Sequence, residues 1–144
     1  MKQCKRLSRF GWLLLVGLIG AWGCGNGNAG PATYPVTGVV RMDAMPVAGA
    51  NVQFTPLDGA TGAQAKTDEA GRFDVSILLD MGRKMQRGLP PGDYAISITK
   101  LEAPNSAKPP KNILPKKYAD PKSSGFQANV SADGTNHVEL PLTP

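Results

Sequence analysis

Apolar and polar residues alternate with a period of two along most of the chain after residue 34. In the stretch 50–55, for example, Val52 and Phe54 alternate with Asn51 and Gln53. Because successive side chains of a strand point to opposite faces, this pattern predicts strands with one buried and one solvated face. A shorter strand is expected at 64–68. The other stretches with clear alternation are 36–42, 72–77, 94–99, 126–131 and 137–142.

Turn signals separate the expected strands. Residues 43–46 are expected to close a first hairpin, 69–71 offer a three-residue loop, and 133–134 are an Asp-Gly turn signal. The 17 glycines and 13 prolines among 144 residues fit many turns rather than long helices. Seven short strands at this spacing predict an all-β fold, a seven-stranded antiparallel β-sandwich. Pro141 has no backbone N–H, so the last strand is expected at a sheet edge.

Two segments break the alternation. Residues 78–89 carry Met81 and Met85 at helical spacing and are expected to be a long connection with one helical turn. The competing interpretation is a basic interaction loop for anionic lipid or polysaccharide. Residues 101–125 contain five prolines and are expected to be an extended crossover along the sandwich. Its expected anchors are Ile113, Leu114 and Tyr118, and the candidate interaction residues of the two segments are Arg83, Lys84, Arg87 and Tyr118.

Three runs of turn and core residues carry a resemblance to a known family. They are Pro46-x-x-Gly49-Ala50-x-Val52-x-Phe54-x-Pro56, Thr67-Asp68-x-x-Gly71-x-Phe73 and Pro91-Gly92-x-Tyr94-x-Ile96-x-Ile98. Together they resemble the carboxypeptidase regulatory-like domain. The resemblance implies a prealbumin-like (transthyretin-like) or immunoglobulin-like sandwich over about residues 36–142, and it carries over no catalytic residue. The run that starts at Leu114-Pro115 further resembles short bacterial lipoproteins built from one such domain.

The N-terminus has the pattern of an export signal. Four cations within the first nine residues precede the apolar run 10–22. This run is well short of the roughly 20 residues that span a bilayer core, and a basic start with a short apolar core describes a secretory signal peptide. We therefore expect residues 1–23 to be a signal helix that is removed on export. Without its four cations the formal charge falls from +5 to +1, so the charge does not point to a nucleic acid.

The leader ends in Ala21-Trp22-Gly23-Cys24, which resembles the lipoprotein box of bacteria. The resemblance implies that Cys24 is the site of lipidation and holds the protein on a membrane. Ordinary signal cleavage, which would leave Cys24 as a free thiol, stays open. The other cysteine lies in the leader, so the mature chain is expected to have no internal disulfide. Residues 24–33 are small and polar and predict a flexible tether, followed by the sandwich domain at 34–144.

No catalytic constellation stands out in the sequence. The one histidine, His137, falls on the outer face of an expected edge strand, where a solvated side chain is the plain interpretation. Asp68, Glu69 and Asp74 lie around one turn and offer oxygens to Ca²⁺, but the EF-hand spacing is absent and turn capping is the competing interpretation. We therefore expect no enzymatic activity, no cofactor and no metal.

These observations predict an exported protein on the periplasmic or cell-surface side of a membrane. We expect a structural or protein-interaction module of the cell envelope, with an envelope protein or polysaccharide as partner. Two alternatives remain, a carbohydrate-binding module and an accessory subunit of a membrane or secreted enzyme. The alternation predicts few exposed aromatic residues, which argues against a flat aromatic platform for sugar rings. It leaves Tyr34 and Tyr118 exposed and points the other aromatic side chains inward, namely Phe54, Phe73, Tyr94 and Phe126. The ligand and the oligomeric state stay open.

Overall fold

The computed structural model describes residues 30–103 and 108–144. The predicted signal peptide 1–23, Cys24 and the predicted tether up to residue 29 lie outside the described residues. The described chain is all-β, with two short 3-10 turns, η1 (Asp80–Gly82) and η2 (Lys116–Ala119). None of its helices is long and apolar enough to cross a membrane.

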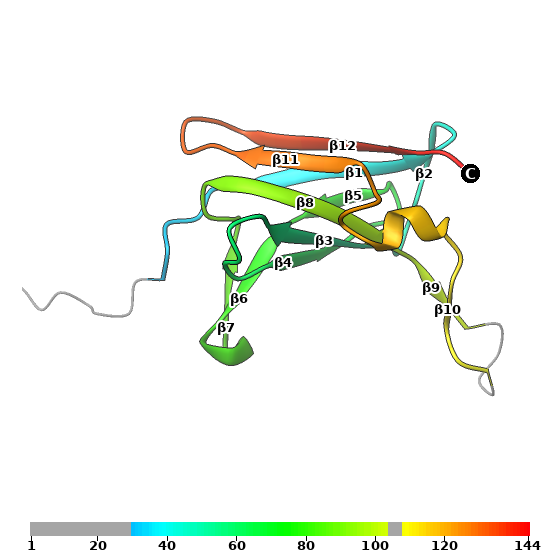
Figure 1. Ribbon diagram of the computed structural model, residues 1–144, viewed down its shortest axis with the longest axis horizontal. Coiled ribbons are helices and arrows are strands. Elements are labelled where there is room, and N and C mark those ends of the chain that lie inside the picture. Colours follow the sequence, from blue (N-terminus) through cyan, green and yellow to red (C-terminus); the bar gives the residue numbers. More distant parts are fainter. Residues whose placement is uncertain (1–29, 104–107) are drawn as a thin grey trace, which may run out of the picture.

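The strands form two main sheets and one short ribbon (Figure 1). The first sheet has the order β12-β1-β2, and β5 also pairs with β1; its strands are β1 (Val36–Met42), β2 (Met45–Pro46), β5 (Arg72–Asp74) and β12 (Asn136–Leu142). The second has the order β11-β8-β3-β4-β6-β7; its strands are β3 (Asn51–Pro56), β4 (Ala63–Lys66), β6 (Ser76–Leu79), β7 (Lys84–Arg87), β8 (Gly92–Thr99) and β11 (Phe126–Val130). The ribbon pairs β9 (Leu101–Glu102) with β10 (Lys111–Asn112).

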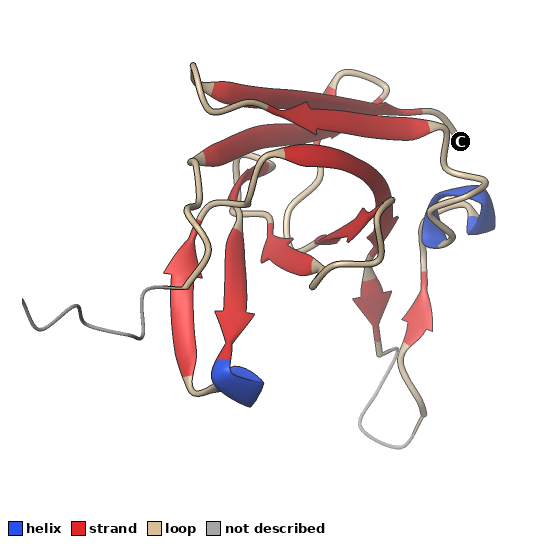
Figure 2. Cartoon of the chain, turned by 60° about the vertical axis from the view of Figure 1, so that its left-hand side comes forward, coloured by secondary structure: helices blue, strands red, loops and turns tan. Residues whose placement is uncertain are grey.

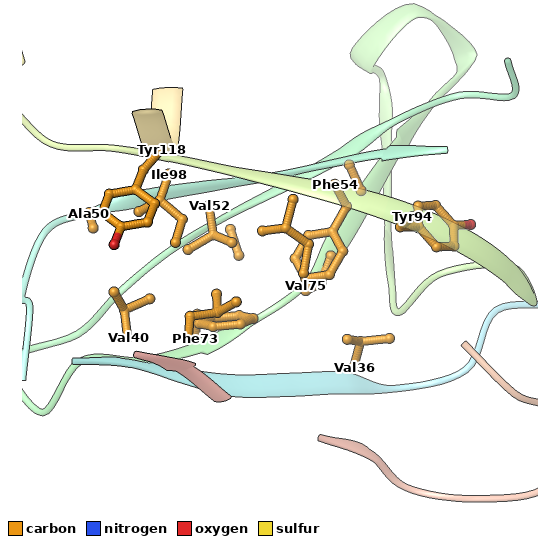
Figure 3. Packing of buried hydrophobic residues seen from close by; sticks show 14 of the residues in the cluster. Val36, Val40, Ala50, Val52, Phe54, Phe73, Val75, Tyr94, Ile98 and Tyr118 are labelled. Atoms are coloured by element: carbon orange, nitrogen blue, oxygen red, sulfur yellow. The ribbon is translucent and has the colours of Figure 1, made fainter. Parts of the chain in front are cut away.

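The inner faces of the two main sheets enclose one hydrophobic core (Figure 3). Phe54 of β3 is fully buried, and its ring centroid lies 6.1 Å from that of Phe73 and 6.3 Å from that of Tyr94. Tilted and edge-on ring pairs at this separation are favourable. The predicted all-β sandwich is therefore confirmed, and the aromatic residues predicted to point inward lie in or against the core.

All seven expected strands are present, but the one predicted at 72–77 is divided between the sheets. β5 pairs with β1, whereas β6 pairs with β4 and β7. The change of sheet happens at Val75, whose N–H donates to the Val36 carbonyl oxygen at 3.0 Å and whose carbonyl oxygen accepts from the Gly88 N–H at 2.8 Å. One continuous stretch thus connects the two layers.

The pairing of β12 with β1 corrects the expectation that the sheets are antiparallel throughout. The two strands are parallel over their whole length, from Val36↔Asn136 to Met42↔Leu142. The Asp-Gly turn at 133–134 therefore closes no hairpin, because it joins β11 in one sheet to β12 in the other. β12 lies at the edge of its sheet, as Pro141 predicted.

Residues 78–89 also differ from the expectation. Instead of a long connection they form a β-hairpin, in which β6 and β7 pair from Ser76↔Arg87 to Leu79↔Lys84 around the η1 turn. The hairpin projects from the body of the sandwich (Figures 1 and 2). Met81 is at its tip with φ 56°, so the spacing of Met81 and Met85 does not reflect a helix.

The segment 101–125 passes along the sandwich and is held there by two of its three expected anchors. Leu114 and Tyr118 are 5% and 4% exposed, and both belong to the core. Ile113 is 50% exposed, so its assignment as an anchor is wrong. It directly follows β10, and its N–H donates to the carbonyl oxygen of Lys100.

Candidate functional site

The structure places the three basic candidate residues on the β6–β7 hairpin, all with exposed side chains. Arg83 follows the η1 turn at the tip, Lys84 begins β7, and Arg87 ends it. Arg87 forms an ion pair with Asp74 of β5, and the hydrogen bond from this pair, together with its charge, raises the pKa of Arg87. The positive charge of Arg87 is therefore compensated by Asp74. Arg83 and Lys84 lie at the end of the hairpin, close to Asp80.

Tyr118 does not belong to this group, which corrects its assignment as an exposed interaction residue. Its ring stacks on Phe126 with centroids 5.6 Å apart, and its hydroxyl accepts a hydrogen bond from the Thr143 N–H at 2.9 Å. Burial raises the pKa of Tyr118, but the hydrogen bonds with Thr143 and the neighbouring Lys117 outweigh it and leave that pKa below its ordinary value. The side chain fastens the crossover segment to the C-terminus of β12.

The described part of the tether lies against the same hairpin. The Gln86 side-chain amide donates to the Pro31 carbonyl oxygen at 3.1 Å and to the Thr33 hydroxyl at 2.9 Å. The Thr33 hydroxyl donates to the Arg87 carbonyl oxygen at 2.8 Å. The tether predicted to be free is thus bound to β7 over its last residues.

A second candidate site is a groove of about 790 Å³ on the outer face of the β12–β1–β5 sheet. The register sets His137 of β12 beside Thr37 of β1 and Thr37 beside Asp74 of β5. Two residues along the strands, the register gives the row Glu139, Val39, Arg72. The groove is therefore lined by positively and negatively charged side chains, which offer hydrogen-bond donors and acceptors on one extended surface.

His137 is exposed, as the alternation predicted. Its Nδ1 lies 3.4 Å from the Thr37 hydroxyl, which is a long contact for a hydrogen bond. The register places Asp74 on the far side of Thr37, so carboxylate, hydroxyl and imidazole do not form the Asp-His-hydroxyl order of a hydrolytic triad. This row can bind a polar ligand.

Of the acidic residues around the β4–β5 turn, Asp68 caps the turn. One oxygen of Asp68 accepts hydrogen bonds from the Ala70 N–H at 2.9 Å and the Arg72 N–H at 2.8 Å. Asp74, the third acidic residue of this group, is paired with Arg87. Over residues 30–103 and 108–144, no group of three metal-ligating side chains comes together.

Comparison with known proteins yields little. No family model matches the chain, and no curated protein is similar to it. Among solved structures, a 9R-lipoxygenase from Cyanothece PCC8801 matches with 14% sequence identity and a TM-score of 0.37. The match covers 78% of this chain but 16% of the lipoxygenase chain.

The lipoxygenase match corrects one expectation from the sequence. The matched protein is an enzyme, so the prediction that this chain is not an enzyme is withdrawn. A TM-score of 0.37 assigns no reaction to the chain.

Proposed function

We propose that the protein is a lipid-anchored β-sandwich outside the cytosol that acts as an interaction module of the cell envelope. The observation that carries this proposal is the basic and apolar leader that ends in Gly23-Cys24, shortly before a folded domain. The described domain supports it, because its two sheets enclose one hydrophobic core and so form a folded unit behind the leader. Two or three acyl chains on Cys24 would hold such a domain stably, at about 0.8 kcal/mol for each buried CH₂.

We also propose that this domain belongs with the carboxypeptidase regulatory-like domains that its turn and core residues resemble. Two positions support the relation. Gly71 has a φ of 71°, which only glycine adopts without strain, and Phe73, two residues later, packs in the core.

Lipidation predicts a sharp difference between the two cysteines. In cells grown with labelled palmitate, the wild-type protein should carry the label, and Cys24→Ser should lose it completely, because the thiol that accepts diacylglycerol is gone. Cys4→Ser is the matched control and should keep the label, since Cys4 is removed with the leader. Mass spectrometry of the purified mature protein should find the acyl mass on Cys24. Label retained by Cys24→Ser, or a wild-type protein without label, would contradict the anchoring.

Carbohydrate binding is a second candidate function, and the groove on the β12–β1–β5 sheet is the observation that favours it. Its charged and polar side chains match the hydroxyl groups of an envelope polysaccharide without a stacking platform. Tyr118 is buried and fastens the crossover to the C-terminus, so its removal cannot report on a sugar site.

A glycan array with the full-length protein tests this candidate. Arg72→Ala should weaken a glycan hit by about tenfold or more, because a hydrogen bond from a charged group contributes about 1.5–3 kcal/mol. Arg83→Ala, on the distant hairpin, is the control and should bind as the wild type does. Binding that survives Arg72→Ala, or an array without hits, would count against carbohydrate binding in the groove.

A further inference from the structure

The path of the tether brings the lipid-bearing end of the chain to the β6–β7 hairpin. Tyr34 pairs with Leu89 at the base of the hairpin, Thr33 bonds the Arg87 carbonyl, and Pro31 accepts from Gln86. At Gly30 a Cβ would lie 2.6 Å from Leu79 Cδ1, so the backbone there is packed on the strand that leads into the tip. Followed backwards from Tyr34 to Gly30, the chain runs from the base of the hairpin toward its tip.

The remaining distance to the lipidation site is short. Five residues lie between Cys24 and Gly30, and the six residue-to-residue steps of that chain span at most about 20 Å when extended. Acyl chains on Cys24 therefore hold the membrane surface within that distance of Leu79. The hairpin is the described element that this constraint keeps nearest to the bilayer.

The composition of the tip suits a membrane surface. Met81 is fully exposed, Met85 is 72% exposed and Leu78 is 41% exposed, so three large apolar side chains face solvent. Arg83 and Lys84 stand among them against one acidic residue, Asp80. Exposed apolar side chains next to cations are the combination that binds the interface of an anionic bilayer.

The β9–β10 ribbon extends from the sandwich to the same side as the hairpin, while β11 and β12 lie on the opposite side (Figures 1 and 2). The ribbon also carries an exposed apolar residue, Leu101, which is 56% exposed, and cations at Lys108 and Lys111. The β6–β7 hairpin and the β9–β10 ribbon, both basic and apolar, could therefore contact the same membrane surface.

We propose that the tip of the β6–β7 hairpin, with Met81, Arg83 and Lys84, contacts the surface of an anionic lipid bilayer. The contact orients the anchored domain with β12 away from the membrane. This inference rests on the proposed lipidation of Cys24, which supplies the short tether.

The test places a single tryptophan at the tip of the full-length, processed protein, because both natural tryptophans lie in the leader. Met81→Trp is reconstituted in vesicles of phosphatidylcholine with phosphatidylglycerol. We expect its emission to shift to the blue and to be quenched by lipids brominated on their acyl chains. The matched control is Leu57→Trp on the β3–β4 loop, at a site that is 61% exposed. Its emission should stay that of a tryptophan in water.

Charge gives a second readout. In vesicles of phosphatidylcholine alone, or with Arg83→Gln and Lys84→Gln added to Met81→Trp, the blue shift should be lost or strongly reduced. If the tryptophan at position 81 stays in water while mass spectrometry finds the acyl group on Cys24, the hairpin contact is overturned and the anchoring stands. If no acyl group is found, the anchoring is overturned together with the orientation. A blue shift in native membranes that is absent from pure lipid would assign the tip to a protein partner and also overturn the proposal.

Discussion

Phe73→Ala is expected to lower the free energy of unfolding by about 3–5 kcal/mol, the usual loss for truncating a buried aromatic side chain. Phe73 is 4% exposed and sits between the sheets, with its ring 6.1 Å from that of Phe54. Its place depends on Gly38, since a Cβ there would collide with the Phe73 ring and with the Val138 carbonyl oxygen. Because Phe73 belongs to the core, its truncation would leave a cavity among other buried side chains, and this cavity adds to the lost transfer free energy.

Urea denaturation of the purified domain measures this effect, and His137→Ala provides the control. His137 is exposed on the edge strand and contacts one hydroxyl at 3.4 Å, so its truncation should change the free energy of unfolding by no more than roughly 0.5 kcal/mol in either direction. If the two variants lost equal stability, the assignment of inner and outer faces would be wrong.

The buried and exposed faces of the strands could be predicted from the sequence, because buried positions are apolar and alternate with polar, exposed ones. Val52 and Phe54 are fully buried, while Asn51 before them and Gln53 between them are exposed. The direction of a strand relative to its neighbour does not change this alternation. β12 alternates in the same way whether it runs parallel or antiparallel to β1, so its parallel pairing could not be predicted.

The hairpin at 78–89 was missed for a related reason. β7 has no buried residue, and β6 beyond Ile77 has none either, so neither strand shows a sustained apolar face. Backbone pairing and contacts with the tether hold this hairpin in place. Neither kind of contact requires apolar residues at every second position of the sequence. A strand that is solvated on both faces resembles a loop in the sequence.

The candidate site was predictable only in part. The cations of the hairpin were found because Arg83, Lys84 and Arg87 are close in sequence. The groove was not found, because it depends on a register that pairs Thr37 with His137, residues from opposite ends of the domain. Tyr118 was predicted both as an anchor and as an exposed aromatic residue, because the proline-rich segment around it has no period that could indicate its face.

Gly71→Ala should be among the most damaging substitutions in the turns of the sandwich, for two separable reasons. Gly71 has a φ of 71°, and a Cβ there would lie 2.5 Å from the Val40 carbonyl oxygen and 3.0 Å from the Val47 nitrogen. The left-handed conformation costs a residue with a side chain about 1–2 kcal/mol, and forcing atoms into filled space costs typically about 1–3 kcal/mol more.

Gly49→Ala separates the two contributions. Gly49 has nearly the same φ, 69°, but nothing lies within 4 Å of the position of its Cβ. It should therefore lose the conformational part alone, about 1–2 kcal/mol, in the same denaturation experiment. Because the Val40 N–H donates to the Gly71 carbonyl oxygen at 2.8 Å, the extra loss in Gly71→Ala reports on the contact between the β4–β5 turn and β1. Equal losses in the two variants would mean that this contact yields without cost, and that the turn is not held against β1.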